Sequence, residues 1–335
     1  MAYVLEFANL IINFGREKVM ADLLDEVVIP AFTDGTLRRH FGKTTYFFQD
    51  VQLLNLGTKS QPEPAVAGRF IKDTVVRREQ YLNPETGRIE PSPREMPTAP
   101  SVTFTLLLAN HKLLYLRETG GAPGFDAFKS TLKKFLTHKY FSFVDAEYAR
   151  RRADAADEEK SKITKKSIRE EYLPPLVTII PLASEATLVQ SIKRFEIIDT
   201  VRVELGSVNA EAHNADLFVQ LRAAKNAVEA ERSILIETKK EGLNKEEVAK
   251  QLSSVALEGN AKVSLYGRTP DNSPLDVSNT DEMRLRVPVA NPPLDLEGKA
   301  GRSLHEFRKA IQDGTIIVGK VDEETAARIR GKFRS

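Results

Sequence analysis

The sequence contains no cysteine and no tryptophan among its 335 residues. The absence of cysteine excludes a disulfide framework, thiol catalysis, iron–sulfur clusters and cysteine-ligated zinc. No apolar run reaches the roughly 18 residues that a membrane-spanning helix needs. Residues 1–7 also lack the basic and apolar regions of a secretory signal. We therefore expect a soluble, cytoplasmic protein without a membrane segment.

The chain also has little net charge, because 49 Lys and Arg residues face 47 Asp and Glu residues, which leaves +2. A global basic field that would attract nucleic acid is therefore excluded. Hydrophobic residues make up 41% of the chain. A chain of this length can bury a substantial core in one large or two medium domains.

Residues 1–144 are predicted to form a mixed α+β domain. Residues 3–12 are apolar and fit a buried strand or a short helix. Residues 17–28 have helical periodicity, and Pro30 is expected to end that helix. Residues 44–56 are rich in aromatic and β-branched side chains, which favours strands.

Two further segments complete this half. Residues 101–117 indicate a hairpin, since Asn110 tolerates the left-handed turn conformation. Residues 83–100 are rich in proline and lack a hydrophobic period, which predicts a flexible surface loop. A glycine-containing turn ending at Gly124 then precedes a helix with an apolar face.

The second half separates into three segments. Residues 145–175 are dominated by charge and predict a solvated helical connector. Residues 176–290 alternate between strand and helix patterns, and residues 291–335 predict a helical tail. The whole pattern indicates an α/β or α+β fold of two-layer sheet-and-helix domains. A ferredoxin-like arrangement is one candidate for the C-terminal half, with a second mixed α+β layer in the N-terminal half.

Most motifs that carry chemistry are absent, including phosphate-binding loops, nucleophile elbows and paired metal-binding histidines. The turn Gly121–Gly124 opens a helix and offers backbone amides to an anion, although such a turn is also an ordinary connector. No metal or cofactor is expected, and an enzymatic function is not favoured.

One short pattern is similar to a nuclease motif. Glu237 and Lys239 end an apolar strand and share one face of it. This resembles the PD-(D/E)xK nucleases, in which an upstream aspartate completes a Mg²⁺ site. Asp216 and Asp199 are the candidates for that aspartate, but Asp216 precedes a helical stripe instead of the adjoining strand. An edge strand with a polar end explains Glu237 and Lys239 equally well.

Local basic clusters provide a second hypothesis. A helix and the start of the charged connector could contact phosphate even though the net charge of the chain is small. Interleaved acids also fit a simple solvated face, and the nearby stripe Phe128, Phe135 and Phe141 fits a core better than a base-stacking platform. The candidate nucleic-acid-binding residues are Lys129, Lys133, Lys134, Lys139, Arg150, Arg151 and Arg152.

Residues from about 101 to 290 resemble a bacterial two-layer α/β family associated with anti-phage defence genes. The resemblance depends on the turn Asn110-His111, the strand and turn of residues 203–209, and Glu241-Gly242-Leu243. It depends also on Lys262–Gly267 with Asn279-Thr280. These are turn and packing positions, so the resemblance implies a defence context and assigns no catalytic residue.

Together these observations favour a non-enzymatic sensor, binding or scaffold subunit of a defence system that contacts nucleic acid or a partner protein. Two alternatives stay open. One is the Mg²⁺-dependent nuclease that uses Glu237 and Lys239. The other is an assembly protein that associates with itself through an exposed apolar patch.

Overall fold

Strand β1 (Tyr3–Asn13) pairs with three other strands. The computed structural model describes residues 3–15, 18–205, 223–224, 227–228, 230, 233–259, 261–319 and 323–331. Strand β1 pairs along one edge with β7 (Lys112–Arg117). Its other edge pairs first with β13 (Arg286–Val289) and then with β8 (Leu176–Pro181). Both of its faces are covered, which explains why it is apolar nearly throughout.

Within the described residues, nine strands form one antiparallel sheet in the order β13-β1-β7-β6-β4-β3-β2, with β8 on β1 and β5 on β4. The remaining strands of this sheet are β2 (Arg39–Phe41), β3 (Thr44–Asn55), β4 (Pro64–Leu82), β5 (Ile89–Thr98) and β6 (Ser101–Leu107). Strands β6 and β7 form the predicted hairpin.

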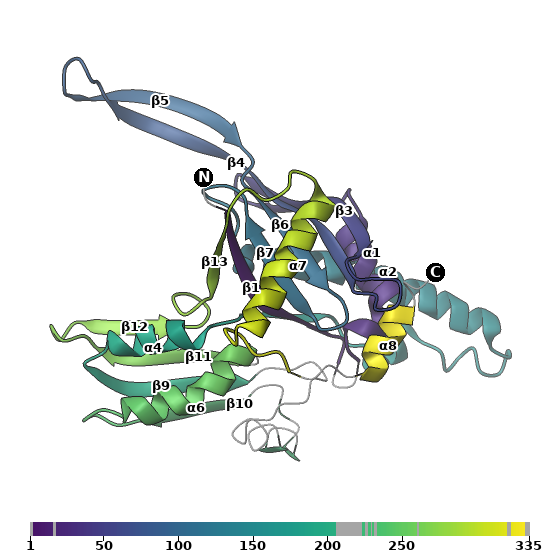
Figure 1. Ribbon diagram of the computed structural model, residues 1–335. Coiled ribbons are helices and arrows are strands. Elements are labelled where there is room, and N and C mark those ends of the chain that lie inside the picture. The colour runs from purple at the N-terminus through teal and green to yellow at the C-terminus, as the bar shows by residue number, and fades with distance from the viewer. Residues whose placement is uncertain are drawn as a thin grey trace.

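Helices cover both faces of this sheet (Figure 1). One face carries η1 (Met20–Leu23), η2 (Leu24–Val28), α1 (Ile29–Thr33) and the long helix α2 (Phe125–Asp154). Phe128 of α2 lies among Phe48, Phe70 and Phe104, with ring centroids 5.2–5.4 Å apart. Such aromatic contacts fix a helix on a sheet beyond the effect of area burial alone.

The opposite face carries α7 (Leu296–Gln312), whose Phe307 ring packs 5.4 Å from that of Phe7. A buried ion pair between Lys299 and Glu118 fastens this helix to the sheet. Burial raises the pKa of Glu118, but hydrogen bonds from Lys299, Ser101 and Thr103 outweigh that effect and leave the pKa below its usual range. The predicted helical tail of residues 291–335 thus contains α7 and α8 (Glu323–Gly331), and α7 is part of the main body.

A second antiparallel sheet has the order β10-β9-β11-β12. Its elements are β9 (Ile197–Leu205), β10 (Ser233–Thr238), β11 (Lys262–Arg268), β12 (Pro274–Ser278), α4 (Glu185–Lys193) and α6 (Lys245–Glu258). Buried residues of both helices and of the sheet share one core, so this unit has two layers as predicted.

The observed architecture is α+β, as the sequence indicated, but its division differs from the predicted one. Strand β8 hydrogen-bonds to β1, so the segment that starts the predicted 176–290 unit belongs to the large sheet. Residues 286–289 likewise pair with β1 instead of β11. Without β8, the small sheet lacks the first strand that a ferredoxin-like order requires.

Two local predictions were wrong for identifiable reasons. Residues 83–100 contain strand β5, which pairs with β4 in a long hairpin. Proline is tolerated there because β5 is an edge strand whose outward amides need no partner. Pro30 does not end a helix, because it lies in the first turn of α1, where its missing amide is harmless.

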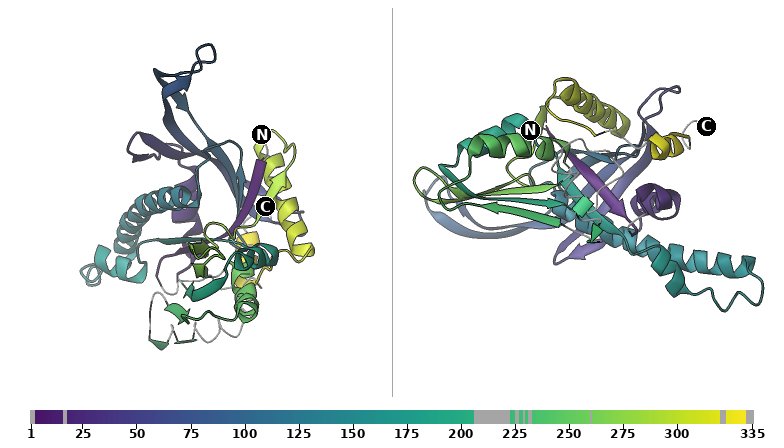
Figure 2. Two further views of the ribbon diagram at one scale, coloured as in Figure 1. Left: turned by 90° about the vertical axis from the view of Figure 1, so that its left-hand side faces the viewer. Right: turned by 90° about the horizontal axis from the view of Figure 1, so that it is seen from below.

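The β4–β5 hairpin from Thr74 to Thr98 projects clear of the body and is called the arm below (Figure 2). The C-terminal half of α2 projects on another side, with α3 (Lys165–Glu171) folded back beside it (Figure 1). No helix among the described residues is long and apolar enough to cross a membrane.

The turn between β6 and β7 adopts its left-handed conformation at His111, with φ of 57°, and not at Asn110. The imidazole is 6% exposed, and its Nδ1 has no hydrogen-bond partner among the described residues. Burial, with a smaller contribution from the charge of Lys112, lowers the pKa of His111 to about 4. The fold therefore holds this histidine neutral at pH 7.

We expect this histidine to make the protein less stable in mild acid. The unfolded chain takes up a proton near pH 6.5, whereas the folded chain resists until about pH 4, so stability falls as the pH drops through that window. Between pH 7 and pH 5 the loss is about 2 kcal/mol. His111→Asn keeps the left-handed turn and removes the titration. Urea unfolding at both pH values should show a smaller loss for the variant, and equal losses would contradict the assignment.

Candidate functional site

The basic residues predicted on α2 have two different environments. Lys129, Lys133 and Lys134 lie on its outer surface, with no ion pair among the described residues. Lys139 instead donates to Asp34 at 2.5 Å, and hydrogen bonds from Lys139 and Thr36 hold the pKa of Asp34 far below its usual range. Of these four lysines, three are available to a ligand and one holds α2 on the loop after α1.

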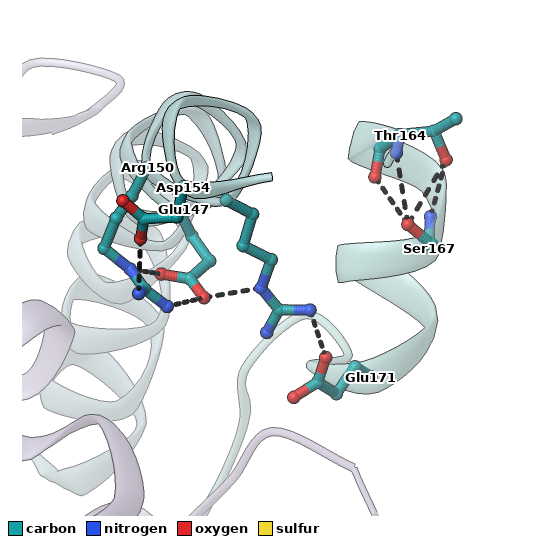
Figure 3. Close-up of polar contacts among 7 residues, drawn as sticks. Glu147, Arg150, Asp154, Thr164, Ser167 and Glu171 are labelled. Carbon is teal, nitrogen blue, oxygen red and sulfur yellow. Dashed lines mark hydrogen bonds and ion pairs between the residues drawn. The ribbon is translucent and has the colours of Figure 1, made fainter. Parts of the chain in front are cut away.

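The predicted arginines are engaged in structural contacts, and Figure 3 shows Arg150 with Glu147 and Asp154. Glu147 accepts from Arg150 at 2.7 Å and from Arg151 at 2.6 Å. Arg151 also donates to Glu171 of α3 at 2.8 Å, and Arg152 donates to the hydroxyl of Tyr148 at 2.8 Å. The contact of Arg151 with Glu171 fastens α3 to α2, and the others lie within α2. This cluster therefore has less positive charge to offer a phosphate than its sequence indicates.

The aromatic stripe of α2 is core only in part. Phe128 and Phe135 are buried, as expected, but Phe141 is 45% exposed. The guanidinium of Arg169 from α3 lies 5.5 Å from the Phe141 ring centroid. Phe141 therefore belongs to the contact between α2 and α3 and not to the core beneath α2.

The structure places the residues of the nuclease alternative at the edge of the small sheet. Glu237 lies on edge strand β10, is exposed, and faces Val201 across the strand pair. The amide of Lys239 donates to the carbonyl of Asp199 at 2.9 Å, and Asp216 lies outside the described residues. Within the described part of the chain, no three acidic or histidine side chains come close enough to hold a metal. The described geometry gives the nuclease alternative no support.

The arm carries a different set of cations that the sequence interpretation missed. Successive side chains of a strand alternate between its two faces. Starting from Phe70, which packs beneath α2, the same face carries Lys72, Thr74, Val76 and Arg78. Cross-strand partners add Tyr46 and Arg39 at the base, and Met96 and Arg94 further out. We call this the basic face: Arg39, Tyr46, Lys72, Val76, Arg78, Arg94 and Met96.

The other face of the arm holds the acids. Asp73 and Glu79 follow the opposite alternation on β4, and Glu95 of β5 pairs with Arg77 at 2.5 Å. Up to the register shift after Arg78, the basic face therefore has four cations and no acid, whereas the opposite face is acidic on balance. Beyond that shift, Glu90 accepts from the hydroxyl of Tyr81, whose ring centroid lies 5.3 Å from the Arg78 guanidinium. A neutral total charge hides this separation, which appears only after β4 and β5 are paired in register.

Two features of the basic face are unfavourable in the isolated protein. Arg78 lies directly opposite Arg94, and like charges in that position destabilise a strand pair. Val76 and Met96 are 49% and 64% exposed. A projecting two-stranded hairpin is itself marginal in water. A bound ligand that carries negative charge and apolar groups would relieve the repulsion between the arginines and cover the exposed apolar side chains.

The base of the arm has exposed aromatic groups beside its cations. The guanidinium of Arg39 lies 5.3 Å from the Tyr46 ring and 5.4 Å from the Phe41 ring. Phe41 is 68% exposed. Arginine over aromatic rings is a platform on which planar bases stack.

No protein-family model and no curated protein sequence matches this chain.

The contact between α2 and α3 gives one stability prediction. Hydrogen bonds from Arg150 and Arg151 outweigh partial burial and lower the pKa of Glu147 to about 2, so the contact stays charged in mild acid. Glu147→Gln should loosen α3 with a global cost of about 1 kcal/mol, because the network is partly exposed. Hydrogen exchange should accelerate in residues 165–171 and stay unchanged in β1. Unchanged exchange in α3 would show that the ion pairs do not hold it.

Proposed function

We propose that this protein binds nucleic acid without catalysis and contacts it chiefly through the basic face of the arm. The observation that carries the proposal is the separation of charge on the hairpin, with Arg78 and Arg94 on one face and Glu79 and Glu95 on the other. A hairpin that is only solvated does not require its charges to be separated by face. A surface that binds a phosphate backbone does require a face with an excess of cations.

The shape of the arm favours a duplex over a single strand. A two-stranded β-ribbon fits the major groove of B-form DNA. Arginines on such a ribbon neutralise phosphates or contact base edges, and exposed apolar side chains such as Val76 and Met96 can lie against bases. We therefore name double-stranded DNA as the preferred ligand.

Helix α2 extends the same surface. The basic face continues from Phe70, which contacts Phe128, so arm and helix lie on the same side of the sheet. Lys129 and Lys133 are one helical turn apart, and Lys134 follows them on the outer surface. These lysines would add phosphate contacts beyond the arm. The predicted defence context stays a prediction, because no feature of this surface bears on it.

The test compares two double variants that remove equal charge from opposite faces. Arg78→Ala with Arg94→Ala removes two cations from the basic face. Arg69→Ala with Arg77→Ala removes two from β4 on the other face. Binding of a labelled DNA duplex is measured by fluorescence anisotropy between about 50 and 200 mM salt.

The wild type should bind with an affinity that falls steeply with salt. The basic-face variant should lose at least about tenfold in affinity, and its slope of log K against log salt should decrease by about 1.8, since each phosphate contact contributes about 0.9. The control variant should keep most of the wild-type affinity and most of the wild-type salt slope. Equal losses in the two variants, or no wild-type binding at low salt, would contradict the proposal. Self-association that depends on Val76 and Met96 without DNA binding would favour the assembly alternative.

A further inference from the structure

Four charged side chains converge where β1, β7 and β13 meet at the end of the large sheet. We call them the arginine cage: Glu6, Arg117, Arg284 and Arg286. Glu6 is 1% exposed and accepts from Arg117 Nε at 3.0 Å and from Arg286 Nε at 3.3 Å. Arg284 Nη1 lies 3.8 Å from the same carboxylate. None of these residues belongs to the arm or to the basic cluster predicted from the sequence.

The cage has an excess of positive charge. Three guanidinium groups surround the buried carboxylate of Glu6, so two positive charges have no buried counter-charge among the described residues. Among the described residues, the other acid that contacts these arginines is Asp281, 3.4 Å from Arg284. Its side chain is 74% exposed, so solvent screens that pair strongly. The side chains of Arg117 and Arg284 are only 26% and 15% exposed. Cations withdrawn from water in this way normally have matching anions.

The cage also has donors to spare. A guanidinium has five N–H groups. Arg117 uses one on Glu6 and one on the carbonyl of Ala122 at 3.3 Å, and Arg286 uses one on Glu6. Among the described residues, the buried Nε of Arg284 has no hydrogen-bond partner. Arg117 thus keeps three unused donors, while Arg284 also donates from Nη2 to Asp281 at 3.4 Å. The outer end of Arg286, whose side chain is 53% exposed, is open to a ligand.

The start of α2 lies against the cage. A Cβ atom at Gly124 would lie 3.9 Å from Arg117 Nη2, and the Arg284 guanidinium lies 5.8 Å from the Phe125 ring centroid. The Tyr115 hydroxyl donates to the carbonyl of Pro123 at 2.7 Å and fixes the loop. Gly124 is the N-cap of α2 and has no side chain to accept from the first-turn amides. These amides and the helix dipole favour an anion at this point.

We propose that the arginine cage binds a phosphate group carried by a small molecule or by the end of a nucleic-acid strand. A phosphomonoester carries close to two negative charges at neutral pH, which matches the excess of the cage, whereas a carboxylate matches half of it. Arg284 and Arg286 donate to the phosphate oxygens, and guanidinium groups suit such bidentate contacts. Glu6 is a positioning residue, because it holds Arg117 and Arg286 and does not contact the ligand.

The experiment measures binding of four probes by calorimetry at constant ionic strength. They are inorganic phosphate, a nucleoside 5′-monophosphate, and one single-stranded oligonucleotide with and without a 5′-phosphate. The test variant is Arg286→Gln, chosen because the side chain of Arg286 is 53% exposed. The matched control is Arg302→Gln on α7, where the arginine side chain is 43% exposed and pairs with Glu306 one helical turn away.

Saturable binding of a phosphate probe that weakens at least about tenfold in Arg286→Gln, and not in Arg302→Gln, supports the cage. If the 5′-phosphate strengthens oligonucleotide binding, the source is a strand end. If only the small probes bind, the source is a free phosphate compound. Absence of saturable binding by any probe, or equal binding in both variants, overturns the proposal. Removal of Arg78 and Arg94 from the arm should leave phosphate binding unchanged, so failure here is distinct from failure of the DNA proposal.

Discussion

The burial of β1 is the constraint on which the rest of the structure depends. A strand with no solvent on either face must find partners for all its backbone groups within the protein. It obtains them from β7 along one edge and from β13 and β8 along the other. These partners come from distant parts of the sequence. The chain must therefore leave the large sheet after β8, build the small sheet, and return at β13.

This return also creates the arginine cage. Glu6 is the register partner of Arg286 on β13 and of Tyr115 on β7. Each of these positions is unremarkable in the sequence, and Arg286 is 280 residues from Glu6. The pairing that completes β1 brings the arginines to one buried carboxylate, so the charge of the cage is a product of the sheet topology.

The arm differs from the arginine cage because its charged surface depends on pairing between two strands that are close in the sequence. It extends beyond the helices that cover the sheet, so its side chains are sorted by the alternation of β4 and β5 instead of by a core. That alternation separates Arg78 and Arg94 from Glu79 and Glu95. A chain with almost no net charge can thus present a surface of one sign, because charges on opposite faces of a ribbon do not meet the same ligand.

Much of the local structure could be predicted from residue pattern. It indicated β3, the β6–β7 hairpin and the apolar face of α2, because periodicity and turn chemistry are local properties. It also indicated the lysines on α2 but not the ion pairs that engage Arg150 and Arg151. Strand β5 was missed because its prolines resemble a loop when its edge position is unknown.

Which strands share a sheet, and therefore which charges share a site, depends on contacts between residues far apart in the sequence. Residues 176–181 and 286–289 have strand patterns that fit either sheet, since the apolar pattern of a strand does not specify which strand it pairs with. The alternation that defines the basic face was present in the sequence from Lys72 to Arg78. The contact of Phe70 with Phe128 shows which side of β4 faces α2, and therefore on which side of the sheet these cations lie. Burial and register, which join distant residues, supplied what local pattern could not.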